Sequence, residues 1–257
     1  MPIGPKRIPF FEHLQELRYR LIVIVVTLVV ASTALYGFTN PILNWLLAPL
    51  HGLLPGDKLN VFGPFETFTF RFKVALYAAI VATSPVIIWQ VLAFFLPALK
   101  PKERKFFVPT ITAAVVLFVA GNAFCYTIIL RTALQWMLGQ APTGVAVVPA
   151  ADQFLSGITL LLLGFGIAFE LPIIVFYAIG FGLIPYAKLR AAWRYVYVAL
   201  MIVASVATPD WSPVTMGALF AALVVLYEAS LLLSRLVFGK RIRQQAIDAA
   251  EAAEALA

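Results

Sequence analysis

The fold is decided by residues 11–38, FEHLQELRYRLIVIVVTLVVASTALYGF, in which a charged segment runs directly into an uncharged apolar one. The apolar part is long enough to enter a bilayer as a helix. Glu12 and Glu16 would then lie one turn apart at the watery end of that helix. Leu14 and Leu17 mark its apolar face. The sequence therefore places an acidic row at a membrane boundary.

These two carboxylates have two interpretations. They suit the capture of a cationic ligand, because fixed acids at a boundary attract positive charge. They also suit ordinary surface pairing with Arg18 and Arg20 on the same helix. Physical chemistry alone favours the second interpretation, since such pairs are common on helices.

Composition indicates a polytopic membrane protein, because 62% of the residues are hydrophobic and only 12% are charged. No shift in composition marks a second globular domain. We expect a cytoplasmic N-terminal segment at 1–20, one membrane domain at 21–238 and a cytoplasmic tail at 239–257. The acidic, Ala-rich end of the tail, at 248–257, is expected to be a solvated helix or disordered.

Uncharged stretches predict an all-α fold with six transmembrane helices. The fifth span is short: a 15-residue helix reaches only about 22 Å, against roughly 30 Å of hydrocarbon. The turn signal TPDWSP at 208–213 makes the last two spans a tight hairpin. The six spans are 21–38, 74–95, 106–130 and 154–182, followed by the shorter 195–207 and 214–233.

The positive-inside rule assigns both termini to the cytoplasm. All but four of the 19 Lys and Arg residues fall on one side of a six-span arrangement. The four on the other side are Lys58, Arg71, Lys73 and Arg131.

The residues offer little support for catalysis. His13 and His51 lie near different ends of the first span, which argues against a metal site. No phosphate-binding loop or nucleophile elbow occurs, so we expect neither an enzyme nor a cofactor. Gly164 and Gly166 lie inside a span, where close helix packing is the expected role. Nothing indicates nucleic-acid binding.

Two acids lie inside apolar runs, where a carboxyl group usually has a function. Glu170 is near the middle of the fourth span, and Pro172 is expected to bend the helix beside it. Charged or neutral, Glu170 could contact a polar group on a partner helix. Glu228 lies closer to the cytoplasmic end, and for it a structural role with an internal partner is as plausible as a functional one.

The loop 96–105, LPALKPKERK, embeds Glu103 among four cations. The acid could moderate repulsion or favour the start of the third helix. Together with Glu16 it also supplies two carboxylates on one membrane face. Each could bind one guanidinium group in a bidentate pair.

An ordered set of motifs along the chain resembles the TatC family. Each motif is weak alone, but the set is specific and extends over nearly the whole chain. The motifs are HLxELRxRL at 13–21, PxExF at 64–68 with Lys73, SP at 84–85 with Gln90 and Phe94, PAL at 97–99, Glu103-Arg104, FELP at 169–172, TPD at 208–210, and Glu228 leading to Ser234-Arg235.

The resemblance implies a concave bundle that serves as receptor and core subunit of the twin-arginine translocase in the bacterial cytoplasmic membrane. Such a receptor binds the Arg-Arg signal peptides of folded proteins with TatB and recruits TatA. Export is driven by the proton-motive force, and self-association and contact with membrane lipid are expected.

The resemblance also implies roles for single residues, in three groups. The expected signal-peptide site is Glu16, Arg18, Phe94, Glu103 and Arg104. The expected contacts to a partner helix within the membrane are Glu170 and Gln90. Roles in the outer loops and caps fall to Pro49, Pro64, Glu66 and Asp210.

One departure and two alternatives accompany this interpretation. The family often has an aromatic residue after Pro-Ala-Leu, whereas this chain has Lys100 and Pro101, which adds positive charge beside the expected arginine site. A proton-coupled small-solute transporter would use Glu170 as its relay. A purely structural scaffold would leave Glu16 and Glu103 dispensable.

Overall fold

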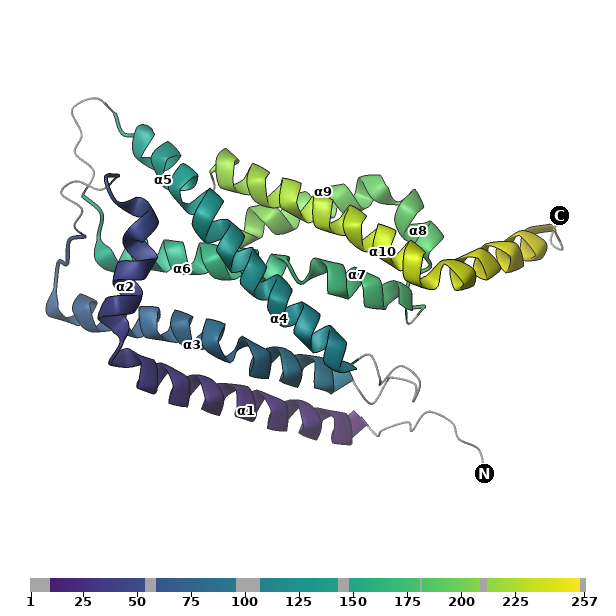
Figure 1. Ribbon diagram of the computed structural model, residues 1–257, viewed down its shortest axis with the longest axis horizontal. Coiled ribbons are helices and arrows are strands. Elements are labelled where there is room, and N and C mark those ends of the chain that lie inside the picture. Colours follow the sequence, from purple (N-terminus) through teal and green to yellow (C-terminus); the bar gives the residue numbers. More distant parts are fainter. Residues whose placement is uncertain are drawn as a thin grey trace.

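The computed structural model describes residues 10–53, 59–95, 107–142, 148–180, 182–208 and 212–254, and its regular elements are helices (Figure 1). The predicted all-α class is confirmed. In chain order the elements are α1 (Phe10–Tyr36), α2 (Thr39–Leu47), the 3-10 turn η1 (Ala48–Leu50), α3 (Pro64–Phe95), α4 (Phe107–Phe124), the π-helical turn η5 (Cys125–Ile129), α5 (Leu130–Gly139), α6 (Ala151–Ala168), α7 (Leu171–Gly180), α8 (Tyr186–Ala191), α9 (Trp193–Ala207) and α10 (Pro213–Glu254).

Every predicted membrane span corresponds to one helix or to consecutive helices that follow one another along the span. α9 is the short one, with 15 residues. The last span is apolar beyond its predicted end at 233, and α10 continues as a helix to Glu254. The five segments long and apolar enough to cross a membrane are Leu14–Tyr36, Pro64–Phe94, Val108–Gly139, Ala151–Gly180 and Pro213–Gly239.

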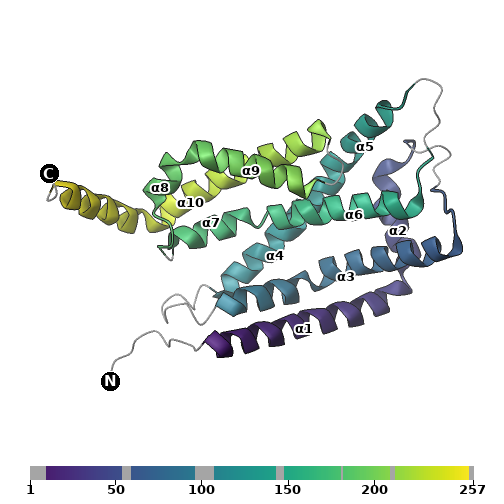
Figure 2. The same ribbon diagram turned by 180° about the vertical axis from the view of Figure 1, so that it is seen from behind.

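The start of α1 and the last turns of α10 lie at the same end of the bundle, which we call the terminal end (Figures 1 and 2). An even number of spans requires this arrangement. At the opposite end, the α2 end, helix α2 crosses the bundle from α1 toward α5 (Figure 1). Sequence reasoning treated this segment as an outer loop.

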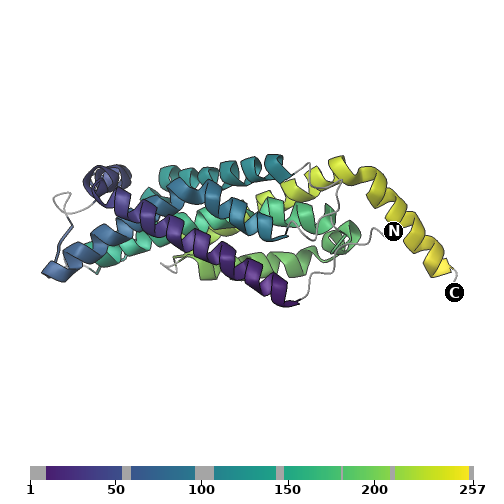
Figure 3. The same ribbon diagram turned by 90° about the horizontal axis from the view of Figure 1, so that it is seen from below.

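Neighbouring helices pack unevenly. α1 lies along α3 (Figures 1 and 3) and exposes a row of valines and leucines on its other side. α4 packs against α6, and α7 and α9 pack against α10. The apolar exposed surface of α1 is what a lipid-facing helix requires.

Glycines allow neighbouring helices to approach α6 closely. A Cβ atom on Gly121 of α4 would lie 2.6 Å from the Phe165 carbonyl oxygen of α6. A Cβ atom on Gly166 would lie 2.3 Å from Asn122 Nδ2, and one on Gly164 would lie 2.8 Å from the Ala207 carbonyl oxygen. The predicted packing role of Gly164 and Gly166 is confirmed.

The fourth span is broken at the predicted place. α6 ends at Ala168 and α7 begins at Leu171, with Phe169 and Glu170 in a turn between them. Pro172 has no amide hydrogen to donate four residues back, so the helical hydrogen bonding is interrupted here. The break sets Glu170 at a corner of the span.

Candidate functional site

Glu16 of α1 binds an arginine of its own helix. Nη2 and Nε of Arg20 lie 2.5 and 3.1 Å from Glu16 Oε1. Nη1 of Arg20 donates to Oε1 of Gln90 on α3 at 3.2 Å. Arg20 and Glu16 expose only 18% and 25% of their side chains. The predicted Glu16–Arg20 pairing is confirmed, and this cluster forms a site that holds a guanidinium group between α1 and α3.

The other expected members of this site are only partly described. Arg18 is exposed on α1, and Phe94 is half-buried on α3, one turn beyond Gln90 on the same face. Glu103 and Arg104 lie outside the described residues. Sequence reasoning placed Gln90 with Glu170, but the structure places its side chain beside Arg20.

Glu170 has one carboxyl oxygen that makes no hydrogen bond within the described part of the chain. Its Oε1 atom is buried and has no hydrogen-bond partner among the described residues, while the side chain as a whole is half-buried. A buried polar atom without a partner is unfavourable. The carboxyl group is therefore suited to a hydrogen bond from outside the chain.

One of the two roles expected for Glu228 of α10 was a structural one with an internal polar partner. The structure shows two such partners. Its Oε2 atom lies 2.8 Å from Arg190 Nη1 of α8. Its Oε1 atom accepts a hydrogen bond of 2.9 Å from the Tyr197 hydroxyl of α9. Glu228 thus ties three helices together.

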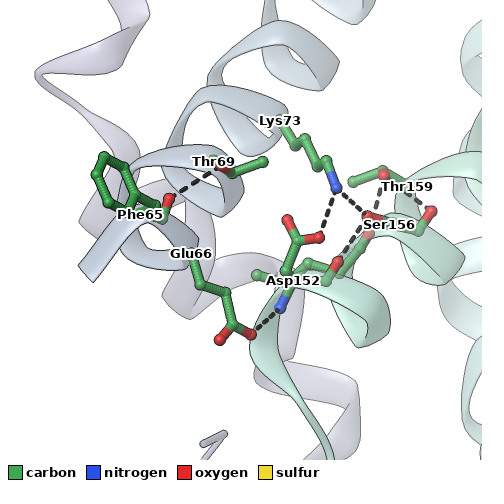
Figure 4. Close-up of polar contacts among 8 residues, drawn as sticks. Phe65, Glu66, Thr69, Lys73, Asp152, Ser156 and Thr159 are labelled. Atoms are coloured by element: carbon green, nitrogen blue, oxygen red, sulfur yellow. Dashed lines mark hydrogen bonds and ion pairs between the residues drawn. The ribbon is translucent and has the colours of Figure 1, made fainter. Parts of the chain in front are cut away.

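Polar side chains also connect α3 and α6 at the α2 end (Figure 4). Nζ of Lys73 lies 2.7 Å from Asp152 Oδ2 and 2.9 Å from Ser156 Oγ. Glu66 Oε1 accepts from the Asp152 backbone N–H at 3.3 Å, and its Oε2 accepts from the Phe62 N–H at 2.7 Å. Glu66 therefore caps the starts of two helices.

The remaining expected cap residues differ in what they contact. The Pro49 carbonyl accepts from Arg131 Nη1 at 3.1 Å. Pro64 is the first residue of α3, a position where its missing N–H costs nothing. Asp210 lies outside the described residues.

Comparisons with known proteins give the same picture over most of the chain. The family model for the Sec-independent protein translocase protein TatC matches residues 12–221. The chain belongs to the TatC family. The TatC of Aquifex aeolicus is 32% identical over 91% of this chain and 97% of its own length, and the TatC of Frankia casuarinae is 35% identical over 90% of this chain and 66% of its own length.

Solved TatC structures have the same fold. A crystal structure described as the twin-arginine translocase receptor TatC in DDM superposes with a TM-score of 0.74. It is 30% identical and is matched over 86% of this chain and 99% of that chain. The chain is thus a TatC-family subunit of the Sec-independent protein translocase, and the small-solute transporter alternative has no support.

Sequence reasoning missed several polar partners in this TatC-family chain. Asp152 was not singled out, although it is the acid in the first turn of α6. The buried pair of Tyr77 and Asn122, whose hydroxyl and Oδ1 atoms lie 3.1 Å apart, was also missed. An acid at a helix start and an amide inside an apolar run were the available signals.

Proposed function

We propose that this TatC-family protein binds the Arg-Arg pair of signal peptides at the terminal end, through the carboxylates of Glu16 and Glu103. The observation that carries the proposal is the contact of Glu16 with the guanidinium group of Arg20. Gln90 accepts a hydrogen bond from the same guanidinium group. An incoming arginine can bind the Glu16 carboxylate in the same way.

The terminal end faces the cytoplasm in this proposal. In the six-span arrangement expected from the sequence, all but four of the 19 Lys and Arg residues fall on the side of the termini, as the positive-inside rule requires. The protein accordingly resides in the bacterial cytoplasmic membrane as a multi-pass protein with both termini inside. Signal peptides of folded proteins would reach Glu16 directly from the cytoplasm.

The apolar part of the signal peptide binds beside the charged site. Phe94 of α3, half-buried one turn beyond Gln90 on the same face, is the apolar side chain expected to contact it. Within the membrane, such apolar contacts stabilise the bound peptide through van der Waals packing.

Partner subunits bind within the membrane at Glu170. Single-span TatA and TatB helices are the expected partners, and a polar side chain on such a helix would satisfy the buried Oε1 atom. Hydrogen bonds between helices in lipid contribute roughly 0.6 to 2 kcal/mol each. The protein acts in this complex without catalytic groups of its own.

The test is binding of a twin-arginine signal peptide and a twin-lysine control to the purified full-length chain. Lysine keeps the charge but loses the planar fork that a carboxylate binds bidentately. Glu16→Gln and Glu103→Gln should each abolish the preference for arginine. Glu12→Gln is the matched control, because Glu12 is exposed one turn earlier on α1. Equal binding of both peptides, unchanged by the substitutions, would refute the mechanism.

A further inference from the structure

A groove of about 700 Å3 opens on the bundle surface near the α2 end. It is bordered by α1, α2, α3, α4 and η5. Figure 1 shows how α4 diverges from α3 toward the α2 end. We call it the α2 groove. Residues from each bordering helix line it, among them Leu35, Pro41, Trp45, Tyr77, Val119 and Tyr126.

The polar side chains in the wall of the α2 groove are already hydrogen-bonded within the protein. The Tyr77 hydroxyl donates to Asn122 Oδ1, and Asn122 Nδ2 donates to the Phe118 carbonyl. The Tyr126 hydroxyl donates to the Trp45 carbonyl, and the Thr127 hydroxyl donates to that of Ala123. The wall therefore favours an occupant without polar atoms, such as a hydrocarbon chain.

A cation lies beyond the lining of this groove, toward the α2 end. Arg71 lies on the face of α3 that carries Ala78, two turns closer to the α2 end. Its Nη2 atom donates to Asn40 Oδ1 at 2.8 Å, which holds it next to Pro41 in the groove wall. Among the described residues Arg71 has no carboxylate partner. Its charge is therefore available to an anion.

We propose that the α2 groove binds one anionic phospholipid of the adjacent leaflet. One acyl chain lies in the groove between α3 and η5, and the phosphate binds the guanidinium group of Arg71. Guanidinium groups bind phosphate bidentately, and the groove holds the acyl chain of the same lipid. The volume is within the range of pockets that hold single small ligands, about 300 to 1,000 Å3.

Trp45 lines the groove and reports its occupancy, because bromine on an acyl chain quenches tryptophan fluorescence on contact. The full chain is prepared with Trp45 as its single tryptophan, the other four being replaced by Phe. It is placed in nanodiscs that contain increasing amounts of brominated phosphatidylglycerol or brominated phosphatidylcholine. The anionic lipid should quench Trp45 at a roughly fivefold lower mole fraction.

Two variants and one control separate the parts of the proposal. Arg71→Gln should bring the two quenching curves together. Ala82→Phe, at an exposed position of the groove wall, should weaken quenching by both lipids. Arg131→Gln removes an arginine at the other end of α2 and should leave the preference intact. Circular dichroism checks that each variant is folded.

Three results would overturn the proposal. Equal quenching by the two lipids in the parent chain would exclude recognition of the anionic headgroup. An unchanged preference in Arg71→Gln would show that the phosphate binds elsewhere. Unaltered quenching in Ala82→Phe would show that the acyl chain contacts Trp45 from outside the groove.

Discussion

Lys73 of α3 and Asp152 of α6 form an ion pair of 2.7 Å between residues 79 positions apart in the chain (Figure 4). The pair lies at the α2 end and is partly shielded, with 36% of the Lys73 side chain and 25% of the Asp152 side chain exposed. It joins α3 of the second membrane span to the first turn of α6 in the fourth. Removing either member leaves the other charge without its partner.

The first prediction concerns this pair. Lys73→Met and Asp152→Asn should each lower stability by about 1 to 2 kcal/mol, less than a fully buried pair because both side chains are partly solvated. The double variant should lose less than the sum of the two single losses. Thermal unfolding in detergent measures all three. Strictly additive losses would mean that the two side chains do not interact.

The second prediction concerns the helix crossing at Gly121. Gly121→Ala should destabilise the protein by about 1 to 3 kcal/mol, because the added methyl group overlaps the Phe165 backbone and the Phe169 ring. Gly157→Ala on α6 is the matched control, since a Cβ atom there meets nothing within 4 Å. That control should be neutral or slightly stabilising. Similar unfolding temperatures for the two variants would contradict the close crossing.

The third prediction follows from the ion pair between Glu16 and Arg20. If an incoming arginine uses Glu16, then Arg20 competes with it and repels it. Arg20→Gln should tighten binding of a twin-arginine peptide by roughly fivefold, and Arg20→Lys should give a smaller gain. Fluorescence anisotropy of a labelled peptide measures this. Weaker binding in Arg20→Gln would instead assign Arg20 to holding the carboxylate in its binding orientation.

The fourth prediction concerns Glu170. Glu170→Leu should abolish crosslinking of a TatA-type single-span helix to this position, whereas Glu170→Gln should keep part of it, because an amide still forms a hydrogen bond in lipid. Binding of the signal peptide at the terminal end should be unchanged in both variants. Full crosslinking to the leucine variant would remove Glu170 from the partner site.

The fifth prediction tests orientation. In a chain with Cys125 replaced by Ala, single cysteines are placed at the exposed positions Thr67 and Gln244. A membrane-impermeant maleimide added outside intact cells should label Thr67→Cys and leave Gln244→Cys unlabelled until the membrane is opened. Both cysteines should react in detergent. The reverse pattern would place the termini outside.

Some features of this chain could be read from local sequence. The spans followed from uncharged length, the break at Glu170 followed from Pro172, and the packing role of Gly166 followed from a small residue inside a span. Helix α2 and the π-helical turn η5 could not be read in this way. A short amphipathic segment has the same composition in a loop, and a single wide turn leaves no mark on apolar periodicity.

The sequence by itself determined that this is an all-helical membrane protein of the TatC type, because apolar length and an ordered set of motifs are properties of the chain alone. Only the tertiary structure decided which charges meet. Arg20 contacts Gln90, Lys73 contacts Asp152, and Tyr77 contacts Asn122 because of how their helices rotate and tilt. Rotation and tilt are set by packing against neighbouring helices, which local sequence does not encode.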